Sequence, residues 1–173
     1  MPYAHRDVSH SADTSWRFYA IPFGGLKDGR YGYGGVRHAS DGGASASYGT
    51  VEKGPIGRAV SRFEVWYQSH AKGGNLEVQV DKGDRKTIST RKDVITDEWL
   101  ALDVPDGPHR LHLRAGGKGE TRVYGVTMER AGPGVVYDSL GVVGCRATRL
   151  LHADQEHLKV QIAHRSPDLL VLA

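Results

Sequence analysis

The sequence predicts a mainly β protein, a jelly-roll β-sandwich followed by a short and incomplete α/β segment. Short runs rich in Val, Leu, Tyr and Phe recur at intervals of roughly 8 to 12 residues between Gly, Asp and Pro, which is typical of sandwiches and jelly rolls. No helical pattern of useful length occurs before residue 130. From residues 131–134, Ala-Gly-Pro-Gly, the pattern becomes partly helical and then ends in an apolar run.

The clearest strand is expected at residues 62–69. There Phe63, Val65 and Tyr67 would share one face, because successive side chains of a strand point to opposite sides. Glycine-rich and Asp-rich turns separate this run from its neighbours. Residues 1–30 are expected to form an edge segment and a loop. Further strands are expected at residues 31–40, 44–52, 76–81, 86–91, 99–104, 109–115 and 122–130.

The predicted domain boundary separates a sandwich module, residues 1–131, from a second, incomplete α/β segment, residues 132–173. Within the second part, Ala147, Leu150 and Leu151 fit one short helix. Asp154 is a plausible N-cap for a second helix, which should end before Pro167. The apolar residues that would form the buried stripe of this second helix are Leu158 and Ile162.

Two apolar runs flank these predicted helices. Residues 135–137 and residues 168–173 are expected to be strands, and the second resembles a parallel strand that is buried on both faces. Such a strand needs further strands and helices to cover it. We therefore expect that the sequence is cut from something longer and that the isolated chain is poorly soluble.

Charge and composition exclude several function classes. The net charge is only +3, and 23 basic residues are interleaved with 20 acidic ones, which argues against nucleic-acid binding. The single cysteine, Cys145, excludes an internal disulfide and is expected to be a small packing residue. No run is apolar enough to span a membrane, and residues 1–5 do not begin a secretory signal.

No cofactor or metal is predicted. His109 and His112 are three apart in a predicted strand and would face opposite sides of the sheet, so they cannot share a metal ion. His152 and His157 do not have the i, i+4 spacing of a helical metal pair. All nine histidines are expected to be solvated or to have packing roles.

Residues 137–146 carry the most specific motif. They match the pattern Tyr-Asp-Ser-Leu-Gly-Val-Asn-Gly-Ala-Arg except at Val143 and Cys145, and in this respect the segment 134–173 resembles the second-block region of SGNH (GDSL-type) esterases with an inserted jelly-roll module. That group includes peptidoglycan and polysaccharide O-acetylesterases. The upstream stretches HRDVSHSADTSWRFY and YGYGGVRHAS resemble the insert of the same proteins less specifically.

The resemblance implies hydrolysis of sugar acetyl esters at the periplasm or cell surface, with polysaccharide or peptidoglycan as partner. It equates Gly144 with a glycine whose backbone N–H faces the oxyanion, and it places the catalytic serine, the oxyanion-hole asparagine and the Asp-x-x-His pair outside the chain. The chain alone is therefore not expected to be catalytic. The tripeptide Asp138-Ser139-Leu140 has the same residues as the motif around the catalytic serine of GDSL-type esterases. Tyr137 rather than glycine precedes it, so a turn or cap role is favoured for Ser139.

A non-catalytic carbohydrate-binding or interaction module is the alternative hypothesis. Flat aromatic rings can stack on sugar faces while neighbouring polar groups bind the hydroxyls. Candidates for such a platform are Trp16, Tyr31 and Trp66, although a strand aromatic is more often a core residue. The acyl group, the glycan, the true termini and the oligomeric state are left open by the sequence.

Overall fold

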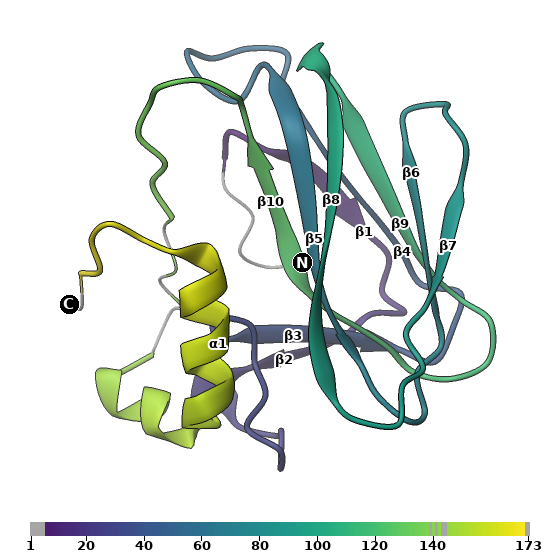
Figure 1. Ribbon diagram of the computed structural model, residues 1–173, viewed down its shortest axis with the longest axis vertical. Helices are drawn as coiled ribbons and strands as arrows, with labels where there is room; N and C mark the ends of the chain where they lie inside the picture. Colours follow the sequence, from purple (N-terminus) through teal and green to yellow (C-terminus); the bar gives the residue numbers. More distant parts are fainter. Residues whose placement is uncertain (1–5, 139, 141, 143–144, 172–173) are drawn as a thin grey trace.

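A computed structural model describes residues 6–138, 140, 142 and 145–171 of the chain. Two five-stranded antiparallel sheets face one another across an apolar core, with a C-terminal helical segment on one side (Figure 1). Sheet A has the order β1-β4-β9-β6-β7 and sheet B the order β2-β3-β10-β5-β8. This architecture confirms the predicted jelly-roll β-sandwich.

The strands of sheet A are β1 (Ser9–Ala12), β4 (Ser45–Gly49), β6 (Asn75–Val80), β7 (Lys86–Ser89) and β9 (Arg110–Gly116). The strands of sheet B are β2 (Arg17–Ala20), β3 (Val36–Ser40), β5 (Val60–Ser69), β8 (Thr96–Gly107) and β10 (Thr121–Glu129). The remaining elements are two 3₁₀ helices, η1 (Ile21–Phe23) and η2 (Ala147–His152), and the helix α1 (Gln155–Arg165).

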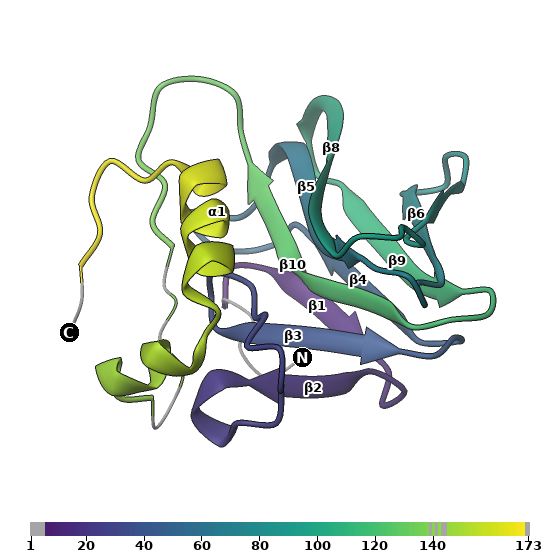
Figure 2. The ribbon, with the colours of Figure 1, turned by 60° about the horizontal axis from the view of Figure 1, so that its bottom comes forward.

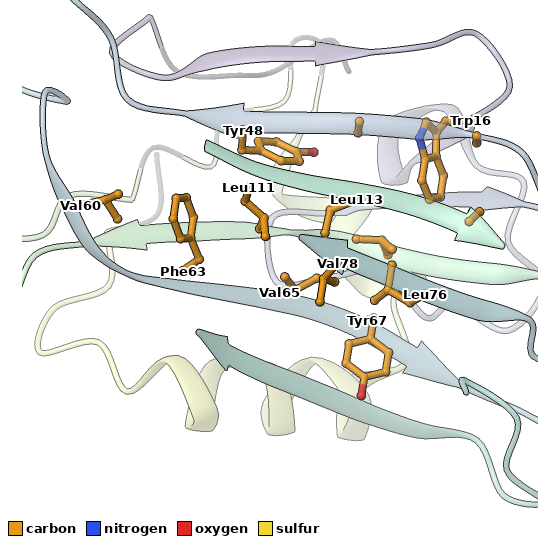
Figure 3. Close-up of a cluster of buried hydrophobic side chains, with 14 residues drawn as sticks. Trp16, Tyr48, Val60, Phe63, Val65, Tyr67, Leu76, Val78, Leu111 and Leu113 are labelled. Carbon is orange, nitrogen blue, oxygen red and sulfur yellow. The ribbon is translucent and has the colours of Figure 1, made fainter. Parts of the chain in front are cut away.

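The core forms where the inward faces of the two sheets meet. Phe63, Val65 and Tyr67 of β5 point into it, as their alternation predicts, and they face Leu111 and Leu113 of β9 (Figure 3). Each of these side chains is at most 8% exposed. Burial of such apolar area stabilises the fold by roughly 25 cal/mol per Å².

Helix α1 lies on the outer face of sheet B (Figures 1 and 2). The predicted N-cap is confirmed, because the Asp154 side chain accepts a hydrogen bond from the His157 backbone N–H. Ser166, in the left-handed conformation, ends the helix before Pro167. The buried stripe was predicted wrongly: His157 and Gln161 are buried, whereas Leu158 and Ile162 are only half-buried.

The two strands predicted in the C-terminal segment are not formed by the described residues. Residues 135–137 and 168–171 have no strand partner, and most of their apolar side chains are exposed. The prediction was wrong because an apolar run becomes a strand only when a neighbouring backbone completes its hydrogen bonds. Residues 172 and 173 lie outside the described part of the chain.

Candidate functional site

The outer face of sheet B carries a buried polar network under α1. We call this surface the covered face and define it by Trp66, Gln68, Asp97, Trp99 and Tyr124. Their positions follow from the strand register, which pairs Trp66 with Trp99 and Gln68 with Asp97 across β5 and β8. Gln68 is 0% exposed although it points away from the core. A polar side chain buried in this way must be satisfied by hydrogen bonds.

The network connects Gln68 to the helix through two shared groups. The Gln68 amide donates to the Tyr124 hydroxyl at 2.7 Å, and this hydroxyl donates to Asp97 Oδ1 at 2.9 Å. Asp97 Oδ2 lies 2.7 Å from His157 Nδ1. Burial and the neighbouring Asp97 raise the pKa of Tyr124 well above its usual value, so this phenol remains protonated and able to donate.

Both ring nitrogens of His157 face oxygen acceptors. Nε2 lies 2.5 Å from the Tyr31 carbonyl oxygen, while Nδ1 makes no well-directed hydrogen bond but lies within ion-pair distance of Asp97. His157 therefore joins α1 to the segment that carries Tyr31 through Nε2 and to Asp97 of β8 through Nδ1.

The charge state of Asp97 agrees with this pairing. Burial alone would raise the pKa of Asp97, but the proximity of His157 and the hydrogen bond from Tyr124 outweigh it and hold the pKa below its usual value. The carboxylate is thus ionised at neutral pH. Because the histidine side chain is 0% exposed, this arrangement attaches the helix to the sheet and offers no surface to a substrate.

Aromatic rings fill the rest of the covered face. The Trp66 and Trp99 rings meet edge to face with centroids 5.9 Å apart. The ring of His164, from α1, stacks on Trp99 at 3.9 Å with an interplanar angle of 13°. His164 Nε2 also lies 3.2 Å from Glu64 Oε2. The helix thus occupies the position that a flat ligand would take on these rings.

The opposite side of the molecule presents an open polar hollow. We call it the sheet A groove; it has a volume of about 590 Å³ and crosses β1, β4, β9 and β6. The register aligns Ser11, Ser47, His112 and Gln79 in one row across these strands. The Ser11 and Ser47 hydroxyls are 2.9 Å apart. Such a row offers hydroxyl, imidazole and amide groups that can bind several sugar hydroxyls at once.

A second row borders the groove and carries charge. Ser45, Arg114 and Glu77 are aligned across β4, β9 and β6. Glu77 Oε2 accepts hydrogen bonds from Arg114 at 3.4 Å and from Arg85 at 3.3 Å. These pairs hold the planar guanidinium and carboxylate groups in place at the rim, where they can form directed hydrogen bonds with a ligand.

The structure buries all three predicted platform aromatics. Trp16 is 7% exposed and belongs to the sandwich core, Tyr31 is 3% exposed, and Trp66 is 2% exposed beneath α1. The other two predicted residues, Ser139 and Gly144, lie outside the described part of the chain. The groove was missed because its members are scattered polar residues that only the strand register brings together.

An Asp-x-x-His spacing does occur at residues 154–157, but it is structural. Asp154 caps the helix through its hydrogen bond from the His157 backbone, and the ring of His157 is directed at Asp97 instead. No cluster of three or more metal-binding side chains is found among the described residues. The described helices include none that is long and apolar enough to cross a membrane.

Comparisons with known proteins show the fold. No family model matches the chain, and no curated protein matches it. A peptidoglycan O-acetylesterase structure is similar with a TM-score of 0.58 and 15% identity over 90% of this chain and 39% of that one. A family 35 carbohydrate-binding module from Clostridium thermocellum has a TM-score of 0.45 and 10% identity over 72% of this chain and 99% of the other. A family two carbohydrate esterase from Cellvibrio japonicus has a TM-score of 0.40 and 14% identity over 74% and 36%.

The chain is a jelly-roll β-sandwich, and the similarity to the peptidoglycan O-acetylesterase shows that the fold is shared. The chain spans 39% of the peptidoglycan O-acetylesterase that it matches. Fold alone does not assign an activity, which must be argued from sites.

Proposed function

We propose that the chain is the sandwich-bearing part of an SGNH-type O-acetylesterase that acts on peptidoglycan or a related polysaccharide and is not catalytic by itself. The observation that supports this proposal is the length of chain that matches the peptidoglycan O-acetylesterase structure. Residues 1–130 make up less than 90% of the 173 residues, so a match that covers 90% includes part of the segment after β10. The match to the carbohydrate-binding module covers only 72% of the chain, and so does not require that segment.

The motif at residues 137–146 supports the same proposal from the sequence. It resembles a block that supplies an oxyanion donor, Gly144, but not the nucleophile. The buried His157 does not replace a catalytic base, because both of its ring nitrogens are engaged. Ester hydrolysis would therefore depend on a serine and a histidine supplied from outside these 173 residues. Its polysaccharide substrate would be met in the periplasm, at the cell surface or outside the cell.

An esterase assay tests the catalytic half of the proposal. The 173-residue chain is incubated with p-nitrophenyl acetate beside its Ser139→Ala variant and a buffer blank. We expect no turnover above the blank for either protein. Turnover that disappears in Ser139→Ala would overturn the proposal and make Ser139 the nucleophile.

We propose that the sheet A groove binds the polysaccharide. It is the hollow in which hydroxyl, amide, imidazole and charged groups converge on the open side of a sheet, whereas the aromatic face of sheet B is covered. This assignment also serves the second candidate function, a carbohydrate-binding module without any esterase role. The groove favours this second function because residues of the sandwich alone form the groove.

A pull-down on insoluble polysaccharides tests the groove. The double variant Gln79→Ala/His112→Ala removes two adjacent side chains of the first row, and Lys118→Ala, in a loop outside the groove, is the matched control. Without the hydrogen bonds that these two side chains would form with the polysaccharide, retention should weaken about tenfold, which corresponds to ~1.4 kcal/mol. Equal retention of the double variant and the control contradicts binding at the groove. So does a failure of the unmodified chain to be retained on any member of a broad polysaccharide panel that includes O-acetylated peptidoglycan.

A further inference from the structure

A row of basic side chains lies along one ridge of η2. Arg149 and His152 are three residues apart in η2, and a 3₁₀ helix has three residues per turn, so their side chains lie on the same side. Arg146, the N-cap residue with extended backbone, precedes Arg149 by three residues. The Arg149 N–H donates to the Arg146 carbonyl at 2.8 Å, which shows that the two residues are one 3₁₀ turn apart. With a rise of about 2.0 Å per residue, successive members are about 6 Å apart along the axis.

This basic ridge borders a hollow of its own. Arg146, Arg149, His152 and the hydroxyl-bearing Thr148 line a space of about 430 Å³, and all four residues are exposed. An adjacent side of η2 is anchored, because Leu150 packs against the small cluster that contains Ile21, Tyr31 and Ala153. The ridge is therefore presented to solvent by a backbone that is held against the sandwich.

Nearby acidic groups are engaged elsewhere. Asp154 accepts from the His157 backbone at 3.0 Å and lies 3.5 Å from Arg30. Glu156 lies 3.5 Å from Lys159. Within the described part of the chain, none of the ion pairs involves Arg146, Arg149 or His152. Like charges one turn apart repel each other, and a bound anion would remove this repulsion.

We propose that the basic ridge binds the carboxylate groups of an acidic polysaccharide. Guanidinium groups bind carboxylates in a bidentate manner, and two of them one turn apart suit a ligand that repeats its acid group along a chain. Among the described residues, no aromatic side chain lines the hollow, so they offer no stacking surface of the kind that single-stranded nucleic acid uses. The inference rests on the proposed function, which makes a polysaccharide the partner, and adds that the polysaccharide is acidic.

Calorimetric titration with matched oligosaccharides tests the ridge. The probes are an oligogalacturonate and its methyl ester, which has the same sugar chain without the negative charges. We expect the 173-residue chain to bind the acid form at low salt and to bind the ester at least about tenfold more weakly. The affinity for the acid form should fall steeply as salt is added, because the contacts are between exposed charges.

The variant Arg149→Gln should weaken binding of the acid form about tenfold. Arg58→Gln removes the same charge from an exposed loop residue that does not line the hollow and should leave the affinity unchanged. Equal binding of acid and ester, equal affinity of the two variants, or the absence of any binding overturns the proposal. Tighter, Arg149-dependent binding of a single-stranded oligonucleotide would also overturn it, in favour of a nucleic-acid ligand.

The two proposals fail separately. Retention on neutral polysaccharide through the sheet A groove is measured with Gln79→Ala/His112→Ala, and Arg149→Gln should not change it. If the ridge is wrong, oligogalacturonate binding is lost or insensitive to Arg149 while groove-dependent retention persists. If the groove is wrong, retention does not respond to the double variant while the response to Arg149→Gln remains.

Discussion

His157 Nδ1 lies 2.7 Å from Asp97 Oδ2, and the two side chains are 0% and 5% exposed. One partner belongs to α1 and the other to β8, so this buried pair joins the helical segment to the sandwich. Removal of His157 leaves the Asp97 carboxylate buried without this partner. The pair therefore specifies where the helix lies on sheet B.

We expect His157→Gln to lower the free energy of unfolding by roughly 3 to 5 kcal/mol, the usual cost of breaking a buried pair. Undocking of α1 would also remove His164 from the Trp99 ring and shift tryptophan emission to longer wavelength. Urea denaturation followed by fluorescence measures both effects. Arg130→Gln, which breaks an ion pair with Asp106 at the surface, is the control and should leave the midpoint unchanged. A double variant Asp97→Asn/His157→Gln should cost less than the two single changes together.

His38 gives the fold a pH dependence of defined sign. Burial lowers the pKa of His38 to about 4 from an unfolded value of 6.5. The unfolded chain therefore binds this proton first as pH falls, so the contribution is fully present above pH 6.5 and is lost progressively toward pH 4. The loss amounts to about 3 kcal/mol.

Urea midpoints between pH 7 and pH 4.5 measure this effect. His38→Gln should flatten the slope of stability against pH, whatever it does to stability at pH 7. Thr87→Ala changes an exposed, non-titrating residue of β7 and should leave the slope as it is. An unchanged slope in His38→Gln would show that other groups cause the acid sensitivity.

Gly73 and Gly125 differ in the space that a side chain would find. A Cβ at Gly73 would lie 2.0 Å from the Thr90 carbonyl oxygen, whereas a Cβ at Gly125 would meet nothing within 4 Å. We expect Gly73→Ala to destabilise the fold by roughly 1 to 3 kcal/mol or more, because the obstructing atom is backbone. Gly125→Ala should cost less than about 0.5 kcal/mol or even stabilise. Thermal unfolding of the pair checks this, and similar midpoints would contradict the close approach of the two loops.

The sequence predicts the sandwich well because its signal is local. Alternation in residues 62–69 and 76–81 reflects one face against the core, and the structure has β5 and β6 there. The covered face could not be predicted in this way. Trp66 and Gln68 occupy the outward positions of β5, and the rings that cover Trp66, those of Tyr33 and His164, are distant in the sequence.

The candidate sites show the same limit. His157 lies in a helix with no local sign of a partner, and Asp97 is far away in the sequence. The sheet A groove depends on a register that places Ser47, His112 and Gln79 side by side. Conversely, residues 168–171 have the local pattern of a strand, but none of the described residues offers a neighbouring backbone with which they pair.

The apolar residues after Pro167 provide the last prediction. Leu169, Leu170 and Val171 are 79%, 55% and 74% exposed, so they contribute little to the stability of the fold but offer an apolar patch to other molecules. We expect Leu169→Ser/Val171→Ser to raise the solubility limit while changing the free energy of unfolding by less than about 0.5 kcal/mol. Leu158→Ser, at a half-buried position of α1 beside Ile21 and Tyr31, is the matched control and should lower stability. A loss of more than about 1 kcal/mol in the tail variant would show that these residues pack against the protein in solution.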